Sequence, residues 1–215
     1  MQHVPKARCG IKKLAAFALM LLIMVGGREM PLNQAHAQEM SAIEFFEQLA
    51  PGWNLGNALD AYIDGVEPED VREYETLWWS PPIEAGLFEA LYERGFRSVR
   101  IPITWNAHLG SDFVVDEAWM DHVQGIVDAA LGSGLFVIIN AHHDAWYAPF
   151  DDNEAQASVG LRKLWQQIAE RFGEYGERLI FESMNEPRLL GTENEFSGGT
   201  PSARAIINRL NSVFV

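Results

Sequence analysis

The chain has 215 residues, 48% of them hydrophobic and 21% charged, and its 16 basic and 30 acidic residues give a net charge of −14. An acidic balance of this size argues against nucleic acid or an anionic membrane surface as a partner.

The first 37 residues have the pattern of a secretory signal peptide. Four basic residues, Lys6, Arg8, Lys12 and Lys13, precede an apolar run of 12 residues from Leu14 to Val25, and Ala35-His36-Ala37 offers a cleavage site. The run is shorter than the roughly 17–25 residues of a membrane-spanning helix, so cleavage is favoured over an uncleaved N-terminal anchor. We therefore expect a secreted protein, extracellular or periplasmic, with residues 38–215 as its mature domain.

Removal of the signal segment makes the protein more acidic and free of cysteine. The segment holds five of the basic residues and one of the acidic ones, so the remaining 178 residues carry 11 − 29 = −18. Cys9 is the only cysteine and leaves with the segment, so we expect neither a disulfide nor a Cys/His zinc site. We also expect no nucleic acid and no membrane as a partner after cleavage.

The mature domain is predicted to start with a helix and a short strand. Ser41 and Glu44 form a capping-box signature, which predicts a helix over residues 41–50 that covers the floor of the domain. A strand interrupted by glycines follows at residues 51–57. The next loop, residues 60–79, is as long as functional loops often are. Trp78 and Trp79 at its end fit two interpretations equally well, stacking on a flat ligand or packing beneath the loop.

A helix and a strand with two distinct faces are predicted next. Ser80 is expected to cap the helix, with Pro81-Pro82 in its first turn and Gly95 at its end. Residues 96–103 alternate as a strand whose Val99, Ile101 and Ile103 would face the helices. Arg100 falls on the opposite face, together with Phe96 and Ser98. In a barrel that face is the interior, where a charge requires a carboxylate partner.

The following unit ends in polar residues. Asp116 is predicted to cap a helix that ends at Gly132, and the apolar strand 135–139 is followed by Asn140-Ala141-His142-His143-Asp144. Two histidines and an aspartate suggest a metal site. Consecutive strand residues point to opposite faces, however, so His142 and His143 should not bind one ion together. We therefore expect no metal site.

The last unit contains the candidate catalytic residue. A helix over residues 161–172 leads to a predicted strand at 179–186, and a final helix carries Ile206, Leu210 and Phe214 on one face. In a barrel of parallel strands, side chains at the C-terminal strand ends line the active site, so Glu186 is the residue we expect to be catalytic. Pro187 should restrict Glu186 to extended backbone. The alternative is an ordinary surface glutamate in a loop.

The order of elements predicts an α/β fold with a parallel sheet. Strands and helices alternate four times, and no Gly-x-Gly-x-x-Gly fingerprint follows the first strand, which disfavours dinucleotide binding. An eight-stranded TIM (β/α)8 barrel would place all the polar strand ends on one rim, but such a barrel needs about 250 residues. We therefore expect a barrel truncated to about its first four βα units.

Four segments carry a family resemblance. GWNLGNALD at 52–60, VRIPITW at 99–105, IINAHHD at 138–144 and FESMNEPR at 181–188 resemble glycoside hydrolase family 5, and within it the bacterial endo-β-1,4-glucanases, or cellulases. The segments cover nearly the whole mature chain. They correspond to the N-terminal half of the family's barrel.

The resemblance implies a retaining hydrolase of β-1,4-linked glucan that acts by double displacement. Glu186 would be the general acid/base. Asn185 resembles the amide that hydrogen-bonds the sugar 2-hydroxyl, and Arg100 the arginine that keeps the nucleophile ionised. His142 resembles the histidine of the sugar-binding subsite, with His143 a weaker candidate. The nucleophile glutamate of the family belongs to the seventh strand, beyond these four units, so we expect this chain alone to be inactive.

Other interpretations stay open at this stage. The chain is alternatively an inactive fragment or pseudoenzyme that only binds glycan, or a family member acting on another β-glycan such as xyloglucan, mannan or xylan. A barrel lyase or aldolase would need a strand-end lysine or metal-binding carboxylates, and neither is found. We expect no cofactor, and a monomer for the full-length enzyme.

Overall fold

The computed structural model describes residues 40–214, and the predicted signal peptide lies outside them. Four strands form one parallel sheet in the order β1-β2-β3-β4. They are β1 (Gly52–Asn54), β2 (Ser98–Ile101), β3 (Phe136–Asn140) and β4 (Leu179–Glu182). The predicted parallel α/β architecture is therefore confirmed.

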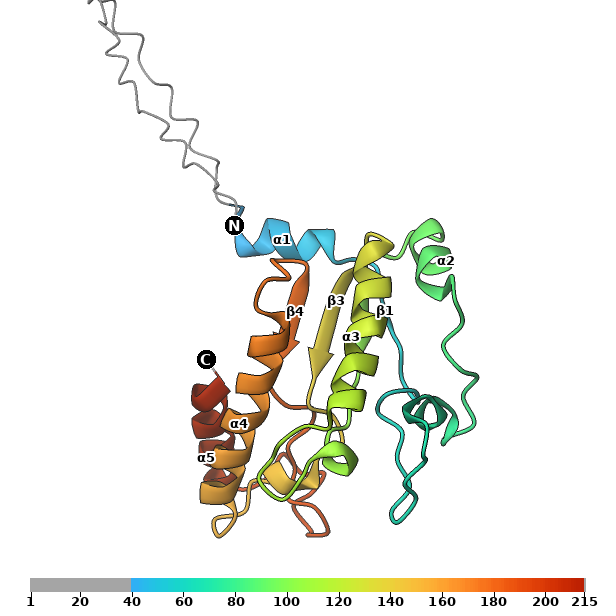
Figure 1. Ribbon diagram of the computed structural model, residues 1–215. Coiled ribbons are helices and arrows are strands. Elements are labelled where there is room, and N and C mark those ends of the chain that lie inside the picture. Colours follow the sequence, from blue (N-terminus) through green and yellow to red (C-terminus); the bar gives the residue numbers. More distant parts are fainter. Residues whose placement is uncertain (1–39, 215) are drawn as a thin grey trace, which may run out of the picture. The chain divides into compact units, whose positions relative to one another are not determined.

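Five α-helices accompany the sheet in the described residues (Figure 1). They are α1 (Ala42–Gln48), α2 (Leu87–Glu93), α3 (Glu117–Gly132), α4 (Glu154–Phe172) and α5 (Pro201–Phe214), with short 3-10 helices η1 (Val71–Thr76), η2 (Asn106–His108) and η3 (Ala145–Tyr147). Within residues 40–214, none of the helices combines the length and the apolar character needed to cross a membrane.

The two faces of the sheet differ as the alternation predicts. Val99, Ile101 and Ile139 have no exposed surface, because they face the helices. Arg100 and Ile138 lie on the opposite face and are half-buried. That inner face corresponds to the barrel interior, and it leaves Phe136, Ile180 and Glu182 half-buried as well.

Helix α1 lies across the N-terminal ends of the strands, away from the polar strand ends (Figure 1). Its capping box is formed as predicted by Ser41 and Glu44. The Phe45 ring lies 5.5 Å from that of Phe136, and the Ser98 hydroxyl donates to the carbonyl oxygen of Leu49 at 2.7 Å. The helix therefore covers the floor of the sheet.

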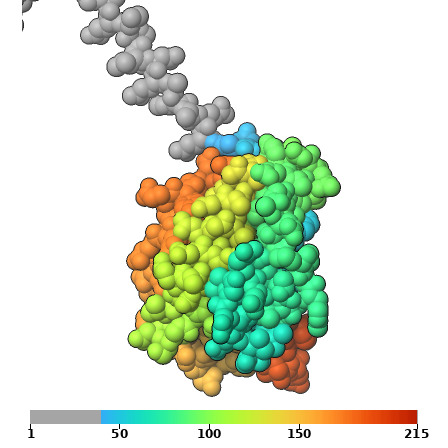
Figure 2. Space-filling view, turned by 45° about the vertical axis from the view of Figure 1, so that its right-hand side comes forward, coloured from blue at the N-terminus to red at the C-terminus, as the bar shows by residue number. Residues whose placement is uncertain are grey.

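The loop after β1 packs beside α3, and Figure 2 shows this teal segment next to the yellow-green one. The contact is aromatic. The Tyr74 ring of η1 lies 5.6 Å from Trp119 of α3, and His108 stacks on Trp119 at 3.7 Å. These rings hold η1, and with it the loop after β1, against α3.

The start of α2 differs from the prediction. The helix begins at Leu87, after Gly86 with φ 88°, and Ser80-Pro81-Pro82 lie outside it. The reason is a tertiary contact: the buried carboxylate of Glu75 accepts a hydrogen bond from the Ile83 N–H at 2.6 Å. That bond holds the segment against η1, and a local capping signal does not report such a contact.

Candidate active site

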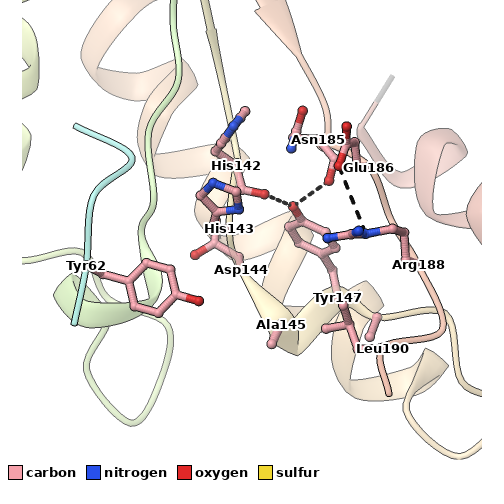
Figure 3. A pocket seen from close by; sticks show the side chains of 11 residues that line it. Tyr62, His142, His143, Asp144, Ala145, Tyr147, Asn185, Glu186, Arg188 and Leu190 are labelled. Atoms are coloured by element: carbon pink, nitrogen blue, oxygen red, sulfur yellow. Dashed lines mark hydrogen bonds and ion pairs between the residues drawn. The ribbon is translucent and has the colours of Figure 1, made fainter. Parts of the chain in front are cut away.

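A pocket lies at the C-terminal ends of β3 and β4 (Figure 3). Tyr62, from the loop after β1, lies on one side of it, and Arg188 and Leu190, from the loop after β4, lie on the other. Between them, the pocket is lined by His142, His143, Tyr147, Asn185 and Glu186. Because carboxyl ends of parallel strands meet at one edge, residues distant in the sequence come together here.

Arg100 has the carboxylate partner that its inward position requires. Its Nε donates to Glu182 Oε2 at 2.7 Å and its Nη2 to Glu182 Oε1 at 2.6 Å. Nη2 also donates to Asn185 at 3.0 Å, and Nη1 donates to Asn54 at 3.2 Å. A guanidinium has five N–H donors. Four of them are therefore used within the described chain, and one N–H on Nη1 remains.

Glu182 is held as a carboxylate by this pairing. Burial pushes its pKa upward, but the hydrogen bonds from Arg100 and Asn140 and the charge of Arg100 outweigh burial, so the pKa lies below its ordinary value. Both carboxylate oxygens accept hydrogen bonds: Oε2 accepts from Arg100, and Oε1 accepts from Arg100 and, at 3.1 Å, from Asn140. The predicted strand at 179–186 ends at Glu182, which places Glu182 inside the sheet and Asn185 beyond it.

The fully buried Asn140 determines the proton position on His142. The backbone N–H of Ile103 donates to Asn140 Oδ1 at 3.2 Å, so the amide oxygen faces Ile103. The amide Nδ2 must then donate to His142 Nδ1, which lies 3.1 Å away. A neutral imidazole carries one proton. The proton of His142 is therefore on Nε2, and this nitrogen can donate to a ligand.

The two histidines are neutral at ordinary pH. Burial, followed by the neighbouring His143 and Arg100 charges, lowers the pKa of His142 to about 4. Burial also lowers the pKa of His143. The site consequently offers imidazole N–H groups rather than imidazolium charges.

The expectation that His142 and His143 point apart is wrong. Their rings lie 4.4 Å apart, and each Nε2 is 4.0 Å from Asp60 Oδ2. Strand β3 ends at Asn140, so the alternation of strand residues no longer applies at position 142. Three residues of metal-ligating types, Asp60, His142 and His143, thus gather in one place.

The donor set nevertheless does not fit a metal ion. A histidine that binds a metal through Nε2 carries its proton on Nδ1 and donates a hydrogen bond from there to an acceptor. Here Nδ1 of His142 faces an amide N–H donor instead. Asp60 is also engaged, because its Oδ1 accepts from the Ala58 N–H at 2.9 Å. The cluster is arranged for hydrogen bonding.

Tyr147 joins the loops that carry the histidines and the candidate acid. Its hydroxyl lies 2.6 Å from the His142 carbonyl oxygen and 3.0 Å from that of Asn185 (Figure 3). The hydroxyl has a single proton to donate, and the 2.6 Å contact is the shortest. Burial raises the pKa of Tyr147, so the proton is retained.

Glu186 has a backbone that differs from the expected extended one. Its φ is 41°, in the left-handed region that non-glycine residues rarely adopt. The preceding Asn185 is fixed at two points: its backbone N–H donates to the Ala141 carbonyl oxygen at 2.7 Å, and its side-chain oxygen accepts from Arg100. The chain must turn sharply after this anchor, and strained conformations of this kind concentrate at functional sites.

The side chain of Glu186 projects from this turn. It is 67% exposed, and Oε2 lies 4.0 Å from Arg188 Nε. The structure brings all five residues predicted from the sequence to one end of the sheet. They are Arg100, His142, His143, Asn185 and Glu186. Their roles stay predictions.

Several residues of the site were not selected from the sequence. Asp60 and Tyr62 come from the loop after β1, Tyr147 from η3 and Arg188 from the loop after β4. Asp60 closes the first of the four quoted segments and Arg188 the last. Their place in these family-like segments could have identified Asp60 and Arg188 as site residues. No sequence motif marks Tyr62 or Tyr147.

The two tryptophans of the first loop have different environments. Trp78 donates through Nε1 to the Tyr62 carbonyl oxygen at 2.7 Å, and its ring lies 5.5 Å from that of His143. Trp79 is 94% exposed. Packing beneath the loop therefore applies to Trp78 alone.

Comparisons with known proteins agree on one family. Residues 59–215 match the model of Cellulase (glycosyl hydrolase family 5). The cellulase/esterase CelE of Acetivibrio thermocellus is 41% identical over 181 residues, which are 83% of this chain and 21% of that protein. Endoglucanase A of Ruminococcus albus is 39% identical over 186 residues, 85% of this chain and 50% of that protein.

Solved structures show the same fold. A GH5-4 broad specificity endoglucanase from Ruminococcus champanellensis with bound cellotriose is 38% identical with a TM-score of 0.78, over 83% of this chain and 53% of that one. One from Clostridium longisporum is 37% identical with a TM-score of 0.76, over 81% and 51%. The chain thus spans about half the length of these structures, as expected for a TIM barrel truncated to four βα units.

Proposed function

The chain belongs to the cellulase family, glycosyl hydrolase family 5, and from this premise we propose that it forms the acid/base half of a retaining endo-β-1,4-glucanase site. The observation that carries the proposal is the turn at Asn185-Glu186, which fixes an amide inward and an exposed carboxylate beside it. The endoglucanases named above, one of them with bound cellotriose, support a β-glucan substrate.

In this proposal Glu186 is the group that changes protonation. A general acid must donate a proton to the departing glycosidic oxygen and then, as a base, activate water. Glu186 suits that exchange because it is exposed and its nearest cation, Arg188, lies 4.0 Å away rather than in a close ion pair. A tightly bound carboxylate such as Glu182 could not release and take up a proton so readily.

The neighbouring groups would orient the sugar. Asn185 uses its oxygen for Arg100, which leaves its amide N–H groups to donate to a 2-hydroxyl. His142 contributes the Nε2 proton that Asn140 imposes, and His143 lies beside it. These groups are held by the protein before the substrate arrives, and such preorganisation favours the transition state.

The reaction needs a second carboxylate as nucleophile. In retaining enzymes the two carboxyl groups lie about 5–5.5 Å apart. Glu182 is engaged by Arg100 and Asn140 through both oxygens, so we propose that the nucleophile comes from barrel strands beyond the four described here. Arg100 would stabilise that carboxylate through its remaining N–H.

Stereochemistry tests the proposal. We expect a protein that carries these residues within a complete barrel to release the β-anomer first from cellopentaose, because double displacement retains configuration. Proton NMR of the first turnovers resolves the two anomers before they equilibrate. Initial release of the α-anomer would indicate inversion and overturn the double-displacement mechanism.

Three further statements belong to this proposal. Residues 1–37 act as a signal peptide and the protein is secreted, as the charge and length of that segment favour. The full-length enzyme is monomeric. The substrate is a β-1,4-glucan, with xyloglucan as the second candidate, because a xyloglucan-specific endo-β-1,4-glucanase from a metagenomic library is 38% identical to this chain.

A further inference from the structure

Trp79 combines two features that neither packing nor backbone preference explains. Its side chain is 94% exposed, and its φ is 58°. A bulky residue with positive φ is an outlier, because its Cβ crowds the following carbonyl oxygen. Glycine adopts this conformation without that cost, so a tryptophan here is unfavourable for the folded chain.

The contacts of Trp79 do not compensate for this cost. Its one hydrogen bond in the described chain runs from its backbone N–H to the Thr76 carbonyl oxygen at 3.0 Å and closes the turn after η1. A glycine would make the same bond. Its ring has no aromatic partner among residues 40–214, in contrast to Trp78 next to it.

The position of Trp79 points to the pocket. It directly follows Trp78, whose Nε1 is bound to the Tyr62 carbonyl oxygen and whose ring lies 5.5 Å from His143. Tyr62 and His143 both line the pocket. Since consecutive Cα atoms lie about 3.8 Å apart, the backbone of Trp79 lies one residue from a side chain that contacts two of the residues lining the pocket.

We propose that Trp79 is a sugar-stacking residue of a distal subsite, which binds a glucan unit further along the polymer than the units beside Glu186. The inference rests on the proposed function and names the substrate length that the site favours. A pyranose ring presents C–H groups on its faces, and an exposed indole offers a flat apolar surface with large contact area. An anchored Trp78 and a free Trp79 would continue the binding surface outward from the pocket.

The test compares short and long oligosaccharides on the same chain. Isothermal titration is performed with cellotriose and cellohexaose on the wild type and on Trp79→Ala, Trp79→Phe and Trp79→Gly. We expect Trp79→Ala to weaken cellohexaose binding about 3- to 10-fold and to leave cellotriose binding within about twofold. Trp79→Phe should retain most of the affinity. Phe46→Ala is the matched control, an exposed aromatic on α1 at the opposite end of the sheet, and should change neither.

Trp79→Gly separates binding from stability. It removes the strained backbone, so its Tm should equal or exceed that of the wild type, while its cellohexaose affinity should fall as in Trp79→Ala. Loss of affinity with an intact fold therefore supports the subsite.

The outcomes also separate this inference from the proposed function. A wild type that binds both oligosaccharides, together with a Trp79→Ala variant that binds cellohexaose equally well, overturns the distal subsite alone. A complete-barrel wild type that neither binds nor cleaves the two oligosaccharides overturns both. If the variants are too poorly folded for titration, the same substitutions within a complete barrel decide the question: KM for cellohexaose should rise and KM for cellotriose should not.

Discussion

Replacement of Glu186 by Gln within a complete barrel should lower turnover of cello-oligosaccharides by about 10²- to 10⁴-fold, the usual contribution of general acid/base catalysis. Glutamine preserves the size of the side chain but can neither donate the proton to the leaving oxygen nor activate water. Because Glu186 is 67% exposed, the change should leave the fold intact, and the loss should appear in kcat rather than in KM.

The leaving group provides an internal check on this prediction. Dinitrophenolate is a good leaving group and departs without protonation. The first step in the cleavage of a dinitrophenyl glycoside should therefore be much less sensitive to Glu186→Gln than the first step with a cello-oligosaccharide. Glu193→Gln is the matched control, since Glu193 is an exposed glutamate of the same loop and should retain the wild-type rate. A Glu186→Gln variant with wild-type turnover of cello-oligosaccharides would show that the acid/base lies elsewhere.

The second large effect concerns the chain by itself, which should show no detectable turnover of carboxymethyl-cellulose. The proposed nucleophile is missing from the four βα units, and a double displacement cannot proceed with one carboxylate. The chain should also associate. Strands β1 and β4 each pair with one neighbour in the described sheet, which leaves two strand edges open, and the inner face is only half-buried.

Light scattering and two adjacent substitutions test the association. Ile138 lies on the half-buried inner face and Ile139 is fully buried against the helices. Ile138→Gln should reduce association and preserve the fold, whereas Ile139→Gln should unfold the chain by burying an unpaired amide. A compact wild-type monomer that melts cooperatively and cleaves the polymer would contradict both the half-barrel and the missing nucleophile.

The fold could be predicted because its main signals are local. Alternation along residues 96–103 assigned Val99 and Ile101 to the helices and Arg100 to the interior, and their burial follows that assignment. Ser41 and Asp116 cap helices as their spacing indicates. Strand alternation and helix caps depend on residues close together in the sequence, and the tertiary structure does not override them here.

The sequence predicted which residues come together in the site, but not how their side chains and backbone are oriented. The expected directions of His142 and His143 depended on strand alternation, yet β3 ends at Asn140. The extended backbone expected at Glu186 ignored the anchor that Arg100 provides to Asn185. Both errors arise where hydrogen bonds between distant segments replace regular structure, and local sequence carries little information about such bonds.

Identification of the nucleophile tests the central claim most directly. A complete-barrel protein is treated with a 2-deoxy-2-fluoro-cellobioside that carries a dinitrophenyl leaving group, which allows the covalent glycosyl-enzyme to accumulate, and the labelled peptide is located by mass spectrometry. If this chain supplies the acid/base half of a retaining site, the label should lie on a carboxylate outside residues 40–214. A label on Glu186 or Glu182 would contradict that account, because it would place the nucleophile within these four βα units.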